Sequence, residues 1–382
     1  MRISKIKYFD QIRRWHLNTM TFKKLTLLVG ASGVGKTQIL KSILNLRNIS
    51  KGSSINGLKW EIEFFILDDI YIWQGEFEKI QQENNIILMD FFENKNDDAK
   101  KDIPKILCEK VYKNKSEIIR RDIDKILFNN VKTVKLPQEK SVINLLKEED
   151  EISIIYKNFQ KIAFHDHSEA SSHRISHSDV NLKVEKYKTI EDIQESDESV
   201  RTKLYLTFYK SKTIFNLIKD KFIDVFPYVE NIKIEPLFSK KIPLFLQDIP
   251  FIQIKEKGID HWIDEKQVSS GMLRTLLHIS ELYLGSNGTV ILVDEFENSL
   301  GVNCIDEMTN ELIINKRDLQ FIITSHHPYI INNISYANWK IVTRKAGNVS
   351  SRDATDFNLG KSKHEAFTQL INLDEYSEGV EV

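Results

Sequence analysis

The fold is decided by residues 30–37, which read Gly30-Ala31-Ser32-Gly33-Val34-Gly35-Lys36-Thr37. This stretch has the pattern of a phosphate-binding loop, in which glycines let backbone N–H groups wrap a polyphosphate. Residues 25–29 before it form a continuous apolar run, and Ile39, Leu40 and Ile43 after it are spaced as on one face of a helix. We therefore expect a buried strand, the loop, and then a helix whose positive end points at the phosphates.

Each residue type in this loop has a chemical role. Lys36 is predicted to neutralise terminal phosphate charge, and the Thr37 hydroxyl is a predicted Mg²⁺ ligand. A plain glycine turn, the competing interpretation, requires neither of them. The predicted nucleotide contacts are Gly30, Ala31, Ser32, Gly33, Val34, Gly35, Lys36, Thr37 and Gln38.

Length and composition narrow the class of protein. A chain of 382 residues predicts a core domain with a second domain or a large insertion. The formal net charge of −1 gives no global bias toward nucleic acid, so any DNA contact has to be local. Cys108 and Cys304, the two cysteines, argue against a disulfide framework. No apolar run is long enough for a membrane span and no signal peptide is evident, so we expect a cytoplasmic chain without a membrane partner.

Two further apolar runs end in polar residues that suit the same chemistry. Residues 289–293 precede Asp294 and Glu295, and residues 319–324 precede Ser325 and His326. Ligands bind at the carboxyl ends of buried parallel strands, so these side chains are expected to meet at the nucleotide. We expect Asp294 to hold Mg²⁺, Glu295 to deprotonate the attacking water, and His326 to contact the γ-phosphate.

A serine-glycine stretch and a glutamine complete the candidate site. Ser269, Ser270 and Gly271 stand about twenty residues before Asp294 and open a segment with an apolar helical face. They read as a helix N-cap that also offers N–H groups and a hydroxyl to a γ-phosphate. Gln74 lies in the second strand of a predicted hairpin, residues 60–64 and 71–77. It is a further candidate contact to Mg²⁺, the alternative being a solvent-facing strand residue.

The middle of the chain differs in composition from both ends. We expect a head made of residues 1–95 and 256–350, a mainly helical insertion at 96–255, and a C-terminal tail at 351–382. Residues 100–125 carry nine basic and five acidic residues, which is a candidate phosphate-contact surface or an ordinary solvated face. The basic residues chosen to test it are Lys113, Lys115, Arg120 and Arg121. The histidine-rich stretch 165–177 reads as a polar loop rather than a metal site.

In their order and spacing these motifs resemble the ABC-type ATPase heads of the SMC-like and OLD-like branch of the AAA family ATPases. The resemblance rests on residues 30–37, 269–271, 293–300 and 324–328. Within the branch, the chain is most similar to short ATPases of bacterial anti-phage systems such as Septu, PARIS and retrons. It implies an α/β head with a mixed sheet and an antiparallel subdomain, interrupted by the insertion.

The resemblance also implies partners and a function. Two heads would pair around two ATP molecules, with Ser269, Ser270 and Gly271 of one chain completing the site of the other, and Asn298 and Ser299 at the seam. We expect an ATPase that hydrolyses Mg-ATP and acts as sensor or scaffold for a separate effector, a nuclease or toxin. OLD-like proteins carry a nuclease domain after the head, and the residues after Val342 are too few for one.

Three alternatives stay open. The first is a DNA-repair or recombination ATPase that grips DNA through residues 100–125. A transporter subunit fits poorly because the insertion splits the head. A P-loop kinase or GTPase fits poorly because it gives no role to the helix after Ser269 or to His326, and no Asn-Lys-x-Asp motif appears.

Overall fold

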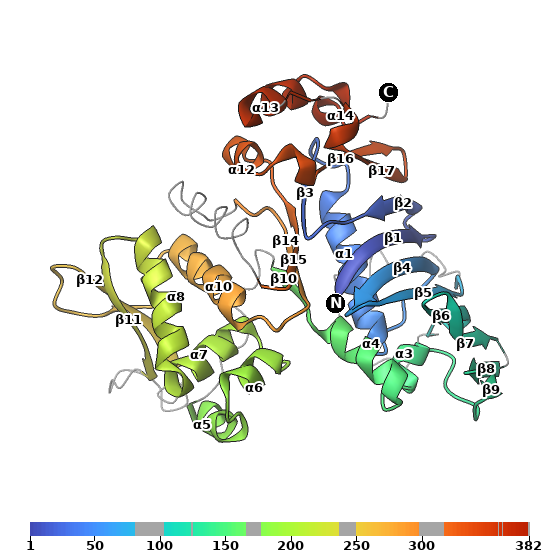
Figure 1. Cartoon of the computed structure of the whole chain (residues 1–382), viewed down its shortest axis with the longest axis horizontal. Coiled ribbons are helices and arrows are strands. Elements are labelled where there is room, and N and C mark those ends of the chain that lie inside the picture. Colours follow the sequence, from blue (N-terminus) through green and yellow to red (C-terminus); the bar gives the residue numbers. More distant parts are fainter. Residues whose placement is uncertain are drawn as a thin grey trace, which may run out of the picture.

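The computed structural model describes residues 1–80, 103–123, 125–165, 177–236, 250–297, 317–357, 359–360 and 362–380. In this part of the chain the strands form one 14-stranded mixed sheet and one three-stranded sheet. Figure 1 shows a lobe rich in strands on the right and a helical lobe on the left, with β10, β14 and β15 between them. The fold is the α/β head with a mixed sheet that the sequence predicted.

The centre of the large sheet is parallel. Its strands follow the order β10-β14-β15-β3-β16, with every neighbouring pair parallel. β3, β14 and β15 are buried along their whole length, as expected of parallel strands covered on both faces. These five strands are β3 (Leu25–Val29), β10 (Ile162–His165), β14 (Thr289–Val293), β15 (Leu319–Thr324) and β16 (Trp339–Lys345).

The rest of the large sheet is mainly antiparallel. The hairpin predicted around residues 60–77 is confirmed as β4 and β5, which pair in antiparallel register. Beyond β16 the order is β17-β2-β1-β4-β5-β6-β7-β8-β9. These strands are β1 (Arg2–Asp10), β2 (Trp15–Thr21), β4 (Leu58–Ile66), β5 (Asp69–Phe77), β6 (Ile106–Lys113), β7 (Ser116–Asp122), β8 (Lys125–Phe128), β9 (Val131–Lys132) and β17 (Asn348–Asp353).

The first part of the expected helical insertion is not helical. Residues 106–132 form β6 to β9, which extend the sheet from the edge of β5. Pairing with β6 satisfies the backbone groups that β5 would otherwise expose at its edge. Asn114 and Lys115 both have positive φ, 50° and 71°, which suits a tight turn between two antiparallel strands. This long-range pairing overrides the local charge pattern.

Helices do follow in the second part of this region. They include two pairs of consecutive helices, as expected of a helical insertion. These are α3 (Val142–Leu145) with α4 (Asp150–Gln160), and α7 (Val200–Lys210) with α8 (Lys212–Val225). The helical lobe also holds α5 (His177–Lys186), α6 (Ile190–Glu195), α10 (Ser270–Leu284), β11 (Val229–Pro236), β12 (Pro250–Glu256) and β13 (Ile263–Asp264).

Two hydrophobic cores lie on opposite faces of the parallel strands. Successive residues of a strand point to opposite faces, so Leu28 and Val29 belong to different cores. One core packs against α7, α8 and α10. The other packs against the antiparallel strands and α4 (Asp150–Gln160), and against α1 (Lys36–Ser50), the helix that begins at Lys36. The parallel strands that carry the phosphate loop therefore pack against one lobe through each of their two faces.

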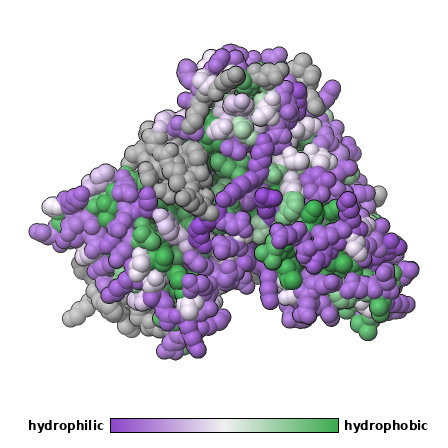
Figure 2. Space-filling view, in the orientation of Figure 1, coloured by the Kyte–Doolittle hydropathy of each residue, from purple (hydrophilic) through white to green (hydrophobic). Residues whose placement is uncertain are grey.

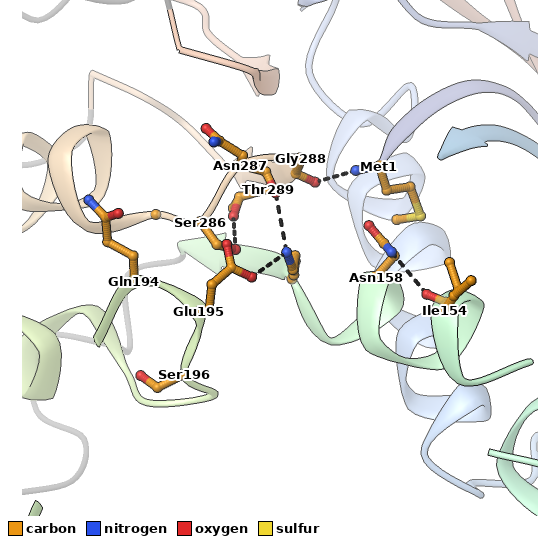
Figure 3. Close-up of polar contacts among 12 residues, drawn as sticks. Met1, Ile154, Asn158, Gln194, Glu195, Ser196, Ser286, Asn287, Gly288 and Thr289 are labelled. Atoms are coloured by element: carbon orange, nitrogen blue, oxygen red, sulfur yellow. Dashed lines mark hydrogen bonds and ion pairs between the residues drawn. The ribbon is translucent and has the colours of Figure 1, made fainter. Parts of the chain in front are cut away.

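The two lobes also meet at the amino ends of β10 and β14. Lys161 Nζ lies 2.6 Å from Glu195 Oε2 of α6 and donates to the Asn287 carbonyl at 3.3 Å. Figure 3 labels Glu195 and Asn287 at this junction. The Met1 ammonium donates to the Gly288 carbonyl at 2.9 Å. These contacts join the helical lobe, the sheet and β1 at the end of the strands away from the predicted nucleotide site.

The expected C-terminal tail is folded. β17 ends at Asp353, and α13 (Lys363–Ile371) and α14 (Asp374–Ser377) follow it. α13 packs against α12 (Pro328–Asn333), and α14 packs against β16. Ala366 and Leu370 of α13 are fully buried in the core, so burial of this apolar face explains why the segment is not a tail.

The surface is mostly hydrophilic (Figure 2). Hydrophobic residues gather at the lower right of that view, over the outer antiparallel strands. Val131 of β9 is 70% exposed, and Val134, three residues further along the chain, is 78% exposed. None of the described helices is long and apolar enough to cross a membrane.

Candidate nucleotide site

The phosphate loop joins the end of β3 to the start of α1. Gly30, Gly33 and Gly35 have φ values of 143°, 82° and 105°, which other residues rarely adopt. A Cβ on Gly30 would lie 2.5 Å from the Val342 carbonyl oxygen of β16. Glycine is therefore required where the loop leaves the sheet, as the sequence motif implied.

Lys36 is held over the loop. Its Nζ donates to the carbonyls of Gly30 at 2.7 Å and Ala31 at 2.8 Å. Burial lowers the pKa of Lys36 to about 8, and the charges of Asp294, Glu297 and Glu295 oppose this shift. The predicted lysine and the predicted carboxylates therefore share one electrostatic environment, although the sequence separates them by more than 250 residues.

Asp294 is the point where three segments meet. Its Oδ1 accepts hydrogen bonds from Thr37 Oγ1 at 3.1 Å and from Thr324 Oγ1 at 2.8 Å. The contact follows from the sheet order, because β15 lies between β14 and β3 and pairs in parallel with both. Asp294 and Thr37 present hard oxygen ligands side by side, which is the donor set that Mg²⁺ prefers.

Glu295 has an unusual backbone conformation. Its φ is 46°, in the left-handed region that non-glycine residues seldom occupy. Its N–H donates to Thr324 Oγ1 at 2.7 Å. Conformations of this kind cost about 1–3 kcal/mol and persist where surrounding contacts enforce them, often at active sites. The bond to Thr324 is one such contact, so Thr324 fixes both acidic residues.

His326 is positioned by an acidic residue whose role the sequence did not reveal. Its backbone N–H donates to Glu297 Oε1 at 2.6 Å. Burial lowers the pKa of His326, as does the charge of Lys36, while Glu297, Glu295 and Asp294 oppose the shift. The neutral imidazole is therefore favoured. The neighbouring His327 instead caps α12, because its Nδ1 accepts from the Tyr329 N–H at 3.3 Å.

Thr324 and Glu297 escaped the sequence analysis for different reasons. Thr324 was read only as the last residue of an apolar strand, although a hydroxyl at that place beside an acidic strand end is a usable signal. Glu297 lies within residues 293–300, and a single glutamate after a strand end gives no signal of its own for a role. Its second carboxylate oxygen, Oε2, is buried without a hydrogen-bond partner in the described structure.

A small cavity adjoins the loop. It has a volume of about 190 Å³, and Gln38 lines it together with Trp15 and Arg344. Its place beside the start of α1 suits the sugar or base end of a nucleotide whose phosphates lie on the loop. A larger cavity of about 870 Å³, lined by Lys161 and Glu195, lies at the opposite end of the strands.

The predicted serine-glycine stretch lies in the other lobe. Ser269 caps α10, since its Oγ accepts from the Met272 N–H at 3.2 Å. Ser269 and Ser270 are exposed. Figure 1 places α10 in the helical lobe with α7 and α8, away from α1. No described contact joins these serines to the phosphate loop.

The structure does not bring Gln74 into the site. Five strands lie between β5 and β3 in the sheet order. Trp73 packs in the core with α1, and the side chain of the next residue in a strand points to the opposite face. Gln74 therefore faces away from α1 and the loop. Asn298 and Ser299 lie outside the described residues.

Three of the four basic residues chosen to test the predicted surface form ion pairs within the chain, whereas the fourth, Lys115, is exposed. Lys113 Nζ lies 2.9 Å from Asp69, and Arg120 Nε lies 2.7 Å from Glu117. Arg121 is 2% exposed, so it cannot contact a phosphate backbone. No cluster of three or more His, Cys, Asp or Glu side chains that could hold a metal occurs among the described residues, and most of the stretch 165–177 lies outside them.

Replacing Thr324 with valine tests its positioning role. The change keeps the shape but removes the hydroxyl that holds Asp294 and the Glu295 N–H, so we expect kcat for ATP hydrolysis to fall about 10- to 100-fold. The KM for ATP should change much less. Thr207→Val, a fully buried threonine in α7, is the control and should leave kcat unchanged. Equal losses in both variants would contradict this role.

The comparisons with known proteins agree with this geometry. The family model described as "AAA domain, putative AbiEii toxin, Type IV TA system" matches residues 25–332. The chain belongs to this AAA domain family. It is an AAA-type ATPase domain, as the motifs predicted at this level. No curated protein matches the sequence.

A solved structure has the same fold as this AAA domain. The crystal structure of an Smc head bound to the C-winged helix domain of ScpA matches with a TM-score of 0.54 and 12% identity, covering 92% of this chain and 97% of that one. The SMC head domain from Thermotoga maritima matches with a TM-score of 0.42 and 14% identity, covering 92% and 99%. The first similarity confirms an SMC-head fold.

Proposed function

We propose that this AAA domain binds Mg-ATP at residues 30–38 and hydrolyses it. The observation that carries the proposal is that Thr37 and Thr324 both donate to one carboxylate oxygen of Asp294. Lys36 shares the electrostatic environment of this carboxylate, and the strained Glu295 follows it in the chain. The hydroxyl and carboxylate oxygens fit a magnesium ion, which would neutralise phosphate charge when bound.

The residues of the site suit a direct attack by water. Lys36 binds the β- and γ-phosphate oxygens, and the loop N–H groups hold the phosphates in line. Glu295 takes a proton from the water as its oxygen forms a bond to the γ-phosphorus. The bond from that phosphorus to the ADP oxygen breaks, giving ADP and phosphate. His326, which is mainly neutral, donates a hydrogen bond to the transferred phosphoryl group.

We further propose that two chains pair head to head. Ser269 and Ser270 are exposed at the N-terminus of α10, where free N–H groups suit a phosphate. They lie in the other lobe of the same chain, so a second chain has to supply them to the loop. The site would then be complete only in the dimer.

Subunit mixing tests this arrangement. Lys36→Ala removes a phosphate contact, and Ser269→Arg blocks the cap of α10, so each variant alone should be inactive. In a mixed dimer one site combines an intact loop with an intact cap, and random pairing gives about a quarter of wild-type activity. Lys266→Ala, an exposed residue near the cap, is the control. A mixture that stays inactive while forming dimers would contradict the shared site.

Finally, we propose that the ATPase serves as sensor or scaffold for a separate effector, a nuclease or toxin, in anti-phage defence. Exposed apolar side chains at Leu67 (94%), Val131 and Val134 support a docking surface on the antiparallel lobe, since such patches often mark interaction sites. The test is purification from the native host with the neighbouring gene products, followed by mass determination with and without ATP. An ATP-dependent dimer that retains DNA and no protein would overturn the proposal.

A further inference from the structure

The C-terminal segment, residues 374–380, lies against the phosphate loop. α14 forms its first half, and Glu375 Oε1 lies 3.5 Å from Arg352 Nη1 of β17. Gly379 then reaches the outer side of the loop with φ +72°. A Cβ at this position would overlap Cγ1 of Val34 and would lie 3.1 Å from Cβ of Ala31. The two segments are therefore packed with no room for a side chain.

The side chain of Val34 is buried where the two segments meet. It is 4% exposed, although Ser32 and Gly33 of the same loop are exposed. Its side chain belongs to the hydrophobic core that packs on α1, and Gly379 of the C-terminal segment lies against it as well. Covering Val34 removes apolar surface from water and favours one position of the loop.

Arg344, in β16, binds both segments at once. Its backbone N–H donates to the Gly379 carbonyl at 2.7 Å, and its Nη1 donates to the Gly33 carbonyl at 3.2 Å. Its Nε donates to the Ala346 carbonyl at 2.7 Å, which holds the guanidinium in place. The loop is thus fixed from outside by a hydrogen bond and by van der Waals contact.

We propose that residues 374–380 act as a brace that holds the phosphate loop in its ATP-binding conformation, through Gly379 and Arg344. The inference rests on the proposed function, because it assigns the brace a role in ATP affinity. Without the brace, the loop spends part of its time in other conformations, and the apparent Kd rises in inverse proportion to the competent fraction. Gly379 and Arg344 are positioning residues, since neither touches the reacting atoms.

The main test is Gly379→Ala. The added methyl group displaces the brace or the loop, so we expect the Kd for the non-hydrolysable analogue Mg-AMPPNP to rise at least about tenfold. In the double variant Val34→Ala/Gly379→Ala the overlapping Cγ1 is gone, so most of the affinity should return.

A matched control separates the contact from backbone strain. Gly258 has φ +78° and nothing within 4 Å of an added Cβ, so Gly258→Ala imposes the same left-handed strain without a clash. It should leave the Kd unchanged. The proposal is overturned if Gly379→Ala binds Mg-AMPPNP as tightly as the wild-type protein does. It is also overturned if the double variant Val34→Ala/Gly379→Ala binds no more tightly than Gly379→Ala alone.

Hydrogen exchange gives a readout that does not depend on a folded variant. In the wild-type protein, Mg-AMPPNP should slow amide exchange in residues 378–380 as well as in the loop, because coupling between two sites is reciprocal. Protection confined to the loop would overturn the brace. If the wild-type protein does not bind the analogue, the proposed function fails, and the brace is then judged by whether Gly379→Ala speeds exchange in the nucleotide-free loop.

Discussion

Replacing Glu295 with glutamine is expected to reduce ATP turnover at least about a hundredfold, because the amide cannot accept the proton of the attacking water. ATP binding should persist, since Lys36, Thr37 and Asp294 are unchanged. The two effects are measured separately, by phosphate release and by equilibrium binding of Mg-ATP. A trapped ATP-bound dimer is the further expected result.

The comparison variant is Lys36→Ala, which should lose ATP binding itself. If Glu295→Gln turns over ATP at the wild-type rate, another group accepts the proton and the catalytic assignment is wrong. If both variants lose binding, Glu295 holds the nucleotide rather than acting as the base. The left-handed backbone of Glu295 makes Glu295→Gly a further probe, which should relieve the strain while removing the carboxylate.

The second large effect concerns a buried charge in the antiparallel lobe. Glu109 is fully buried, and its Oε1 accepts from Trp73 Nε1 at 2.8 Å and Ser141 Oγ at 2.5 Å. Its Oε2 accepts from the Val142 N–H at 2.9 Å and lies 3.8 Å from Arg121 Nη1. Burial raises the pKa of Glu109, whereas these four contacts lower it. The carboxylate therefore joins β5, β6 and β7 to the start of α3.

Glu109→Ala should destabilise the protein by about 3–5 kcal/mol, because it leaves the buried Arg121 without its charge partner. Denaturation by urea, followed by tryptophan fluorescence, measures the change. Glu117→Ala breaks the exposed pair with Arg120 in the same lobe and should cost less than about 1 kcal/mol. Equal midpoints for the two variants would show that the buried cluster does not stabilise this lobe.

Both predictions depend on pairings that only the folded chain shows. The acidic strand end at Asp294 was read from the sequence, but its bond to Thr324 depends on the parallel register of β14 and β15. The strand character of residues 106–132 was missed because it depends on pairing with β5, which local composition does not encode. Arg121 likewise looked like a surface charge until its burial beside Glu109 was seen.

Local patterns in the sequence were enough to predict the phosphate loop, the acids at the end of β14, His326 and the N-cap of α10. These signals are local, because each depends on a few neighbouring residues. They are the glycines of a tight loop, a hydroxyl beside a lysine, and an apolar run followed by a charged residue. Three features could be seen only in the folded chain: Thr324 bonds to both acids, Gln74 faces away from the loop, and Gly379 packs on Val34. Such contacts join residues tens to hundreds of positions apart, and packing of the whole chain sets them.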